Sequence, residues 1–127
     1  MVDMVVNHVG YIDLNQTSGV TPFYNRTDFH NCLELKAQGL CDDCQVPNNV
    51  NLSNGVDYYL AQNTRCRLSG LPDLNHTKEE VRDALVNWVK NIFGTYGFQG
   101  ARFDAVGHIP TVWGQVDRHR GAVDWSS

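Results

Sequence analysis

The part of this sequence that most constrains its fold is a helical pattern followed at once by a strand-like run, within residues 77–106. Apolar side chains recur at helical spacing and predict one buried stripe; they are Val81, Leu85, Trp88, Val89, Ile92 and Phe93. Residues 98–106 then have the pattern of a strand. Since a second apolar run occupies residues 1–9, the order indicates an α/β protein with two parallel strands.

The helix carries signals for both of its ends. Thr77, followed three residues later by Glu80, predicts a capping box at the start. Gly94 and Gly97 predict the end, because glycine favours the left-handed conformation that terminates helices. The apolar stripe between these ends is expected to lie in the core.

The second strand brings polar side chains to its far end. Arg102 and Asp104 are two residues apart, so both point to the same face of an extended strand, and His108 follows soon after. A guanidinium beside the carboxylate keeps it ionised and oriented. An ionised, fixed carboxylate at a strand end is what a covalent nucleophile requires.

The first strand and the long segment after it suggest that more protein surrounds this chain. Residues 1–9 are mostly apolar, which is typical of a strand buried on both faces of a parallel sheet. Residues 11–70 are rich in Asn, Asp, Gly and Thr and lack sustained periodicity, which indicates a functional loop or a small subdomain. Two strands cannot bury both of their faces, so we expect the chain to be a fragment of a larger barrel.

All cysteines lie in this long segment, at positions Cys32, Cys41, Cys44 and Cys66. Their even number predicts two disulfides with three possible pairings. Four Asn-x-Ser/Thr sequons, at Asn15, Asn25, Asn51 and Asn75, also favour an extracellular or vacuolar protein. Two alternatives remain: the sequons may arise by chance in Asn-rich loops, and the Cys41-x-x-Cys44 pair could bind zinc or perform redox chemistry.

Composition excludes several classes of function. The net charge is −4 and no cluster of Lys or Arg occurs, which argues against nucleic acid as the main partner. No apolar run approaches the roughly 20 residues of a membrane span. The first residues lack the charged and long apolar regions of a signal peptide, so no signal peptide is expected within this chain.

Three short motifs, in this order, resemble the α-amylase family of glycoside hydrolases. They are Asp-Met-Val-Val-Asn-His at residues 3–8, Leu-Pro-Asp-Leu-Asn at residues 71–75, and residues 100–108. Residues 66–74 are similar to animal-type and fungal α-amylases in particular. The resemblance covers nearly the whole chain and implies a retaining enzyme that cleaves α-1,4-glucosidic bonds within starch, glycogen or maltooligosaccharides.

The same resemblance implies the fold, a fragment of a (β/α)8 TIM barrel with an inserted, disulfide-containing B domain. Residues 1–10 would form barrel strand three and residues 11–70 the B domain. Residues 71–127 would form helix three, strand four and the following loop. The full-length parent is expected to be a monomer.

The family's catalytic residues carry over one by one. Asp104 corresponds to the nucleophile, which forms a covalent glycosyl-enzyme, and Arg102 orients it. His8 and His108 correspond to residues that contact substrate. Asp3 corresponds to a structural partner at the end of the first strand.

The resemblance also implies a calcium ion that ties the B domain to the barrel. Its ligands would be the side chains of Asn7 and Asp73 and the main-chain carbonyls of His108 and Thr64. Amide, carboxylate and carbonyl oxygens are the hard ligands that Ca²⁺ prefers.

Two departures from the family matter for activity. Gly107 stands where the family often has a Lys that binds substrate beyond the cleavage point. A retaining glycosidase also needs a second carboxylic acid about 5 Å from the nucleophile. In the family this Glu lies on strand five and a further Asp on strand seven, and neither strand is within this chain. The glutamates present are in other segments, at Glu34, Glu79 and Glu80, so we expect the chain alone to be inactive.

Several expectations concern individual residues. We favour disulfides Cys32–Cys66 and Cys41–Cys44. Three histidines are expected to be solvated: His30, His76 and His119. Tyr11 and Trp113 are aromatic residues that we expect to pack rather than to stack on sugars.

Three alternatives to an α-amylase remain open at this point. The chain may belong to another enzyme of the family, such as an α-glucosidase or a transglycosylase. It may be a non-catalytic, disulfide-stabilised secreted module that binds calcium or glucan. It may also be a truncated product that does not fold stably alone.

Overall fold

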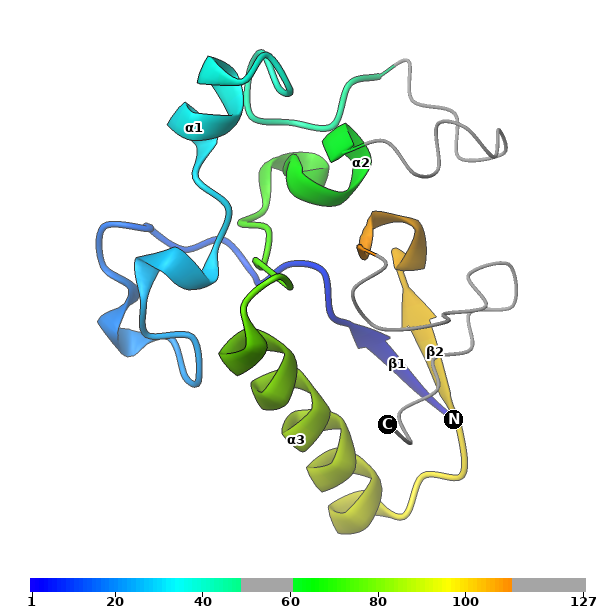
Figure 1. Cartoon of the computed structure of the whole chain (residues 1–127). Helices are drawn as coiled ribbons and strands as arrows, with labels where there is room; N and C mark the ends of the chain where they lie inside the picture. The colour runs from blue at the N-terminus through cyan, green and yellow to red at the C-terminus, as the bar shows by residue number, and fades with distance from the viewer. Residues whose placement is uncertain (49–60, 111–127) are drawn as a thin grey trace.

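The computed structural model describes residues 1–48 and 61–110, which form a two-stranded sheet, three α-helices and several single-turn 3-10 helices (Figure 1). In chain order the main elements are β1 (Val2–Val5), α1 (Cys32–Ala37), α2 (Ala61–Arg65), α3 (Glu79–Tyr96) and β2 (Ala101–Asp104). The single turns are η1 (Thr17–Gly19), η2 (Arg26–Asp28), η4 (Leu68–Gly70) and η5 (Val106–His108). Within the described ranges no helix is both long enough and apolar enough to cross a membrane.

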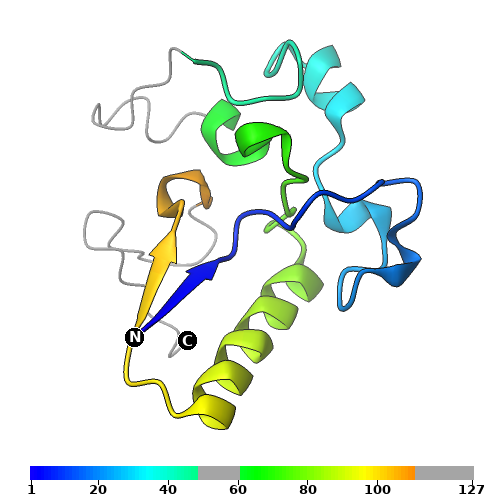
Figure 2. The ribbon, with the colours of Figure 1, turned by 180° about the vertical axis from the view of Figure 1, so that it is seen from behind.

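The two strands are parallel, which confirms the predicted strand order. Val2 pairs with Ala101, and Val5 pairs with Asp104 at the other end. Both strands are shorter than the runs at residues 1–9 and 98–106 suggested, with four residues each. Their arrowheads point toward the half of the molecule that carries α1 and α2, as the front and back views show (Figures 1 and 2). The carboxyl ends of the strands therefore face the long segment.

The prediction that the first strand is buried on both faces is wrong for this chain. The side chain of Met4 is 1% exposed, whereas that of Val5 is 40% exposed. In the described part of the chain, the face of β1 that carries Val5 is therefore only partly covered. Alternating burial of this kind is usual for a strand with one covered face.

Helix α3 starts later than the capping-box pattern predicted. Its N-cap is Lys78, whose side chain makes no capping hydrogen bond. Thr77 lies outside the helix, one residue before the N-cap, and its hydroxyl donates to the side-chain oxygen of Asn75. The predicted capping box is wrong, and the guanidinium of Arg82 binds the carbonyls of His76 and Thr77 at this end.

At the other end of α3, one of the two predicted glycines terminates the helix. Gly97 is the C-cap, with the left-handed φ of 66° that glycine adopts without steric cost. Gly94 lies within the helix, so the prediction that it contributes to the stop is wrong. The helix therefore runs for 18 residues and reaches the start of β2 through a short turn.

The predicted apolar stripe of α3 is only partly in the core. Val81, Leu85 and Val89 are buried, but Trp88 is 40% exposed, contrary to the prediction. The indole lines an apolar hollow of about 350 Å³ that Val5 of β1 also lines. The described residues leave this hollow open, which explains why a tryptophan on the helical stripe is not fully buried.

The core links the helix to the strand and to the long segment. It contains side chains from α3, from the long segment and from the residues that follow the two strands, namely Val6, Phe23, Phe29, Leu74, Val81, Leu85 and Ile109. The rings of Phe23 and Phe29 meet edge to face, with centroids 6.3 Å apart. A second, smaller cluster consists of Leu35, Cys41 and Cys66.

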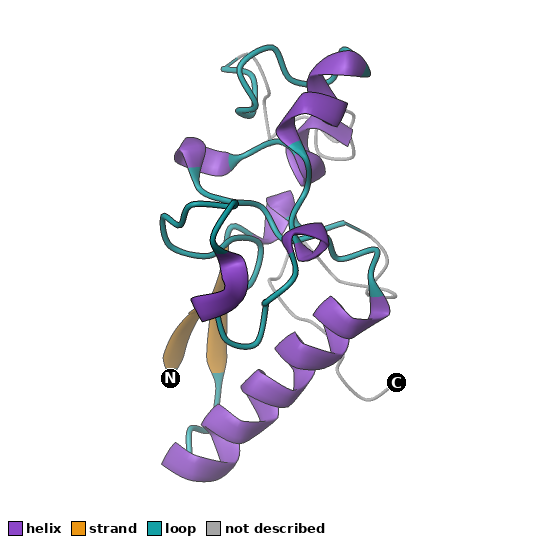
Figure 3. Ribbon diagram, turned by 90° about the vertical axis from the view of Figure 1, so that its left-hand side faces the viewer, coloured by secondary structure: helices purple, strands orange, loops and turns teal. Residues whose placement is uncertain are grey.

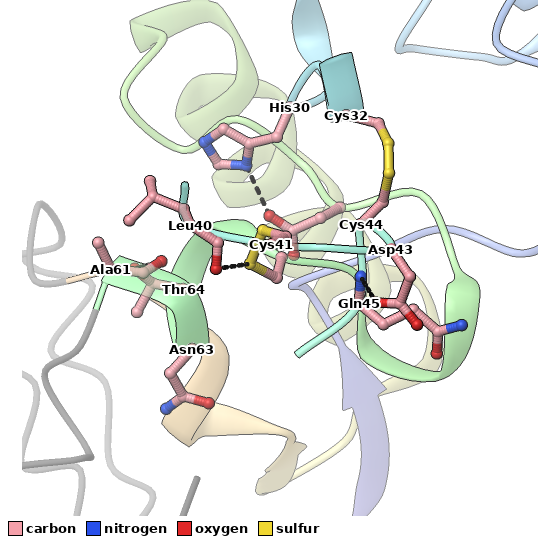
Figure 4. Close-up of a disulfide and its surroundings, with 12 residues drawn as sticks. His30, Cys32, Leu40, Cys41, Asp43, Cys44, Gln45, Ala61, Asn63 and Thr64 are labelled. Atoms are coloured by element: carbon pink, nitrogen blue, oxygen red, sulfur yellow. Dashed lines mark hydrogen bonds and ion pairs between the residues drawn. A yellow bond between two sulfur atoms is a disulfide. The ribbon is translucent and has the colours of Figure 1, made fainter. Parts of the chain in front are cut away.

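The four cysteines form two disulfides, but in another pairing from the one we favoured. The bonds are Cys32–Cys44 and Cys41–Cys66, with Cα atoms 5.2 Å and 6.1 Å apart (Figure 4). Cys41 points inward to the second cluster, whereas Cys44 has a left-handed φ of 70° and turns toward the start of α1. The two side chains of the Cys-x-x-Cys pair therefore face different partners, and no free thiol remains for zinc or redox chemistry.

The long segment leaves the first strand and returns to the helix at adjacent points. The amide of Val9 donates to the carbonyl of Pro72 at 3.2 Å, and the amide of Leu74 donates to the carbonyl of Asn7 at 2.9 Å. Further along, the amide of Asn75 donates to the carbonyl of Asp28. The side view shows this crossing of loops above the start of α3 (Figure 3).

Candidate functional site

Three charged side chains lie on one face of the two-stranded sheet, and one of them, Asp104, is at the carboxyl end of β2. The guanidinium of Arg102 binds the carboxylate of Asp3 at 2.6 Å and that of Asp104 at 2.9 Å. Asp3 is the register partner of Arg102 across the sheet, and Asp104 is two residues further on the same strand. All three side chains are about half exposed. The expected contact between Arg102 and Asp104 is present in the structure.

His8 lies close to this group. Burial lowers the pKa of His8, and the nearby His108 lowers it further, while the carboxylate of Asp104 acts in the opposite direction. The imidazole is therefore neutral at pH 7 and can donate one hydrogen bond and accept another. Its Nδ1 is buried and has no hydrogen-bond partner among the described residues.

His108 is held by a residue that the sequence patterns did not identify. The Nδ1 of His108 donates to the main-chain carbonyl of Asn63 at 2.8 Å. In return, the side-chain amide of Asn63 donates to the carbonyl of Gly107 at 2.7 Å. Asn63 is fully buried and lies on α2, so this pair of bonds joins α2 to η5. No motif surrounds Asn63, and only the tertiary contact marks it.

Asn7 and Asp73 are adjacent and buried, as a calcium site requires. A short antiparallel bridge pairs His8 with Asp73, directly after Asn7. The side chain of Asn7 is completely buried, and neither of its polar atoms has a hydrogen-bond partner among the described residues. Such an orphaned amide is costly unless a cation or water satisfies it. This observation fits a calcium ion at Asn7.

The other two predicted ligands lie on the segments that Asn63 joins. Thr64 follows Asn63 on α2 and is buried, with its hydroxyl 3.4 Å from the carbonyl of Ala61. His108 is also buried, on η5. No group of three or more His, Cys, Asp or Glu side chains gathers in the described ranges. The predicted donor set differs from such a cluster, since it uses one carboxylate together with amide and carbonyl oxygens.

His30 contacts Asp73, which the sequence prediction missed. The Nδ1 of His30 is 2.6 Å from Oδ2 of Asp73, and the carboxyl group is 2% exposed. Burial lowers the pKa of His30 to about 4, with smaller contributions from His76 and Arg65. Burial also raises the pKa of Asp73 well above its usual value, against the effect of Arg67. Without a cation, both groups therefore favour the uncharged form.

Three further expectations about single residues are wrong or lie outside the structure. His30 is mostly buried and His76 is completely buried, so neither is solvated as predicted. The Nε2 of His76 donates to the carbonyl of Val6 at 2.7 Å. Tyr11 is 86% exposed and does not pack as expected. His119 and Trp113 lie outside the described residues.

No glutamate lies beside Asp104 in the described ranges. Glu34 is in the first turn of α1, and Glu79 and Glu80 are in the first turn of α3, at the amino end of that helix. The carboxylate that shares Arg102 with Asp104 is that of Asp3.

Comparison with known proteins gives one family. A family model described as the catalytic domain of alpha-amylase matches residues 1–124. A curated relative, the beta/alpha-amylase of Paenibacillus polymyxa, is 29% identical over 110 residues, which are 87% of this chain and 8% of that protein.

Solved structures agree with this match. An α-amylase from Anoxybacillus superimposes with a TM-score of 0.57 at 26% identity, over 86% of this chain and 19% of that one. An α-amylase from Malbranchea cinnamomea shows the same fold with a TM-score of 0.52 at 21% identity, over 87% and 21% of the two chains. The chain therefore spans about a fifth or less of the length of these relatives.

Proposed function

Because the chain belongs to the family of alpha-amylase catalytic domains, we propose that it forms the nucleophile-bearing part of a retaining glycosidase. Its substrate would be an α-glucan such as starch, glycogen or a maltooligosaccharide, cleaved internally at α-1,4 bonds. In this proposal β1, α3 and β2 are strand three, helix three and strand four of a (β/α)8 barrel, and residues 11–70 are the inserted B domain. The observation that supports it best is the Arg102–Asp104 contact at the carboxyl end of β2.

The proposed chemistry uses Asp104 as the nucleophile. A carboxylate oxygen attacks the anomeric carbon, the glycosidic C–O bond breaks, and a glycosyl ester forms on Asp104. The departing oxygen takes a proton from a general acid, and water later hydrolyses the ester and restores the carboxylate. Arg102 keeps the carboxylate aimed, since its guanidinium binds one oxygen and leaves the other for attack. His8, neutral at pH 7, would hydrogen-bond a sugar hydroxyl.

The residues that would hold calcium are Asn7, Asp73 and the carbonyls of Thr64 and His108. The orphaned Asn7 amide and the buried Asp73 carboxyl support this set. When bound, the ion supplies a cross-link between segments rather than a reactive group. The chain's own contribution is to bring α2 and η5 together through the Asn63 bonds, and to hold Asp73 at the end of β1 through the bridge with His8.

The chain alone should not turn over starch, because the carboxylate that shares Arg102 with Asp104, that of Asp3, is itself held in an ion pair, and no glutamate contacts Asp104 among the described residues. We expect no reducing-sugar release from soluble starch by the purified chain. Turnover that disappears in Asp104→Asn would show that this expectation is wrong.

A covalent trap tests the nucleophile without needing the missing acid. An activated 5-fluoro-α-maltosyl fluoride carries a leaving group that departs without protonation, so ester formation depends on the nucleophile and on sugar binding. We expect peptide mass spectrometry to find the sugar on Asp104, and none in Asp104→Asn. Arg102→Met should be labelled more slowly, because its carboxylate is no longer aimed.

The matched control is Asp83→Asn, which changes an acidic residue on the exposed side of α3 and should not affect labelling. Labelling of a different residue, or equal labelling of Asp104→Asn, would contradict the assignment of Asp104. Absence of any label on a chain that circular dichroism shows to be folded would also count against it.

We further propose that the protein is secreted and carries an N-glycan on Asn25. Asn25 is exposed, and its side-chain oxygen accepts a hydrogen bond from the amide of Thr27 at 3.0 Å. A glycan attaches to the amide nitrogen and leaves this oxygen free to keep its bond. Expression through a eukaryotic secretory pathway, followed by glycosidase treatment and peptide mapping, should show occupancy at Asn25 that Asn25→Gln removes. An unmodified Asn25 would contradict the proposal.

A further inference from the structure

We propose that His30 is a positioning residue for the calcium site. It fixes the Asp73 carboxylate so that the carboxylate can bind the cation together with the Asn7 amide. This inference rests on the calcium site of the proposed function. It assigns a role to a residue on the long segment, far in sequence from Asp73.

The contact between His30 and Asp73 is part of a rigid three-point attachment. The main-chain amide of His30 donates to the carbonyl of Asp73 at 2.9 Å, and the neighbouring pair Phe29 and Leu74 forms an antiparallel bridge. The side chains then meet at 2.6 Å. Because both backbones are fixed, the imidazole has little freedom to move away from the carboxylate.

On its other side, the segment that carries Asp73 is attached to the end of β1. His8 forms a bridge with Asp73, and the amide of Leu74 binds the carbonyl of Asn7. The carboxylate therefore lies between His30 and the segment that bears the buried, unpartnered Asn7 amide. A carboxylate offers about four lone-pair sites, so a bond from His30 to Oδ2 leaves sites for a cation.

Such a partner is expected on general grounds, because carboxylates that bind metals are commonly oriented by hydrogen bonds from residues that do not touch the metal. His30 also connects the site to the disulfide-bonded part of the chain, since it lies two residues before Cys32, which is bonded to Cys44 (Figure 4). Changes in that part of the chain would thus be transmitted to the calcium ligand through His30.

Calcium affinity measured by titration calorimetry on the full, chelator-treated chain tests this role. His30→Leu removes the bond to Asp73 and should weaken Ca²⁺ binding about 10- to 100-fold, the usual effect of losing such a partner. His30→Asn keeps an N–H near the position of Nδ1 and should bind within a few-fold of the native chain. His30→Gln places its amide one bond further out and should resemble His30→Leu. The calcium-dependent rise in melting temperature should follow the same order.

The control is Lys78→Met, which removes a bond of the same length between the same two regions. Lys78 binds Asp28 at 2.6 Å and touches none of the proposed calcium ligands. It should lower stability without changing calcium affinity. If His30→Leu does not fold, as judged by circular dichroism, the comparison of His30→Gln with His30→Asn decides whether His30 positions Asp73.

Three outcomes would overturn the inference. Equal calcium affinity in the native chain and His30→Gln or His30→Leu would show that His30 does not position Asp73, while leaving the calcium site intact. An equal loss of calcium affinity in Lys78→Met would show that any weakening of the contact between the two regions lowers the affinity. No calcium binding by the native chain would reject the calcium site itself, and with it the role of His30.

Discussion

Two polar regions lie near each other in this molecule and are built in different ways. At the strand rim, Asp3, Arg102 and Asp104 form ion pairs whose side chains are about half exposed. At the hinge, where the long segment meets the start of α3, the side chains of Asn7, Asp73 and His76 are almost completely buried. The rim holds full charges in water, and the hinge holds groups that burial drives toward their neutral forms.

The difference shows which part of the site this chain completes by itself. Exposed ion pairs are screened by water and contribute little to stability, so the rim is oriented but not rigidly held. Buried polar groups must be satisfied, so the hinge is specified by the packing around it. The chain therefore builds its proposed metal site from its own segments, whereas the carboxylate of Asp104, the proposed nucleophile, is about half exposed.

The largest expected effect is a dependence of stability on pH that arises at the hinge and not at the rim. Burial lowers the pKa of His76 to about 4, against 6.5 for the free side chain, although bonds to the carbonyls of Val6 and Leu74 oppose the shift. As the pH falls, the unfolded chain thus binds a proton at His76 before the folded chain does. The contribution of His76 to the free energy of unfolding is therefore fully present above pH 6.5 and is lost as the pH falls toward 4. The loss from His76 should be on the order of 3 kcal/mol. Urea unfolding between pH 7.5 and pH 4 measures it.

His76→Gln is the control for this pH effect. It keeps an N–H donor for the Val6 carbonyl but has no proton to gain, so its stability should fall less over the same range. An identical pH dependence in both chains would mean that other groups, not His76, determine the acid sensitivity.

A smaller effect is expected at the contact between α2 and η5, which lies between the two regions. Asn63→Leu removes the donor to the Gly107 carbonyl and leaves that carbonyl without its partner. The cost of such a loss is about 1–3 kcal/mol. Urea unfolding at pH 7.5 should show it, whereas Thr64→Val, which removes only a long hydrogen bond within α2, should cost less. A larger loss in Thr64→Val would contradict the role given to Asn63.

The smallest effect on stability is expected at the rim. Arg102→Met breaks both ion pairs of Arg102, yet these are exposed, and the change in unfolding free energy should stay below about 1 kcal/mol. The difference from the native chain should shrink further in 1 M NaCl, because salt screens exposed charges. A loss comparable to that of Asn63→Leu would show that the rim is as rigid as the hinge.

The Arg102–Asp104 half of the rim was predictable from the sequence, since it depends on local geometry, whereas the contact of Arg102 with Asp3 spans 99 positions and was not predicted. Arg102 and Asp104 share a face because a strand repeats every two residues, and the parallel pairing then sets Asp3 beside Arg102. The resemblance to α-amylases added Asn7 and Asp73, and the family match supports that resemblance. The roles of these residues stay predictions until they are tested.

The contacts of the hinge, and the contact between α2 and η5, could not be predicted in the same way, because each joins distant segments. His30 meets Asp73 across 43 positions, and Asn63 meets Gly107 across 44. No local pattern distinguishes a histidine that binds a buried carboxyl group from one that is solvated. The disulfide pairing failed for the same reason, because the turn at Cys44 directs its side chain away from Cys41 and toward Cys32.

The bond between Val9 and Pro72 has a consequence for how proteins of this kind can diversify. The long segment leaves the first strand and returns to the helix at adjacent points, so the middle of this segment can be lengthened, shortened or replaced without pulling the strands apart. The entropy of closing a loop rises only slowly with its length. However, His30 and Asn63 lie on this segment and contact residues of the proposed site. Exchange of this segment between relatives should therefore preserve the fold. The exchanged segment should, however, bring with it the residues that position the proposed site.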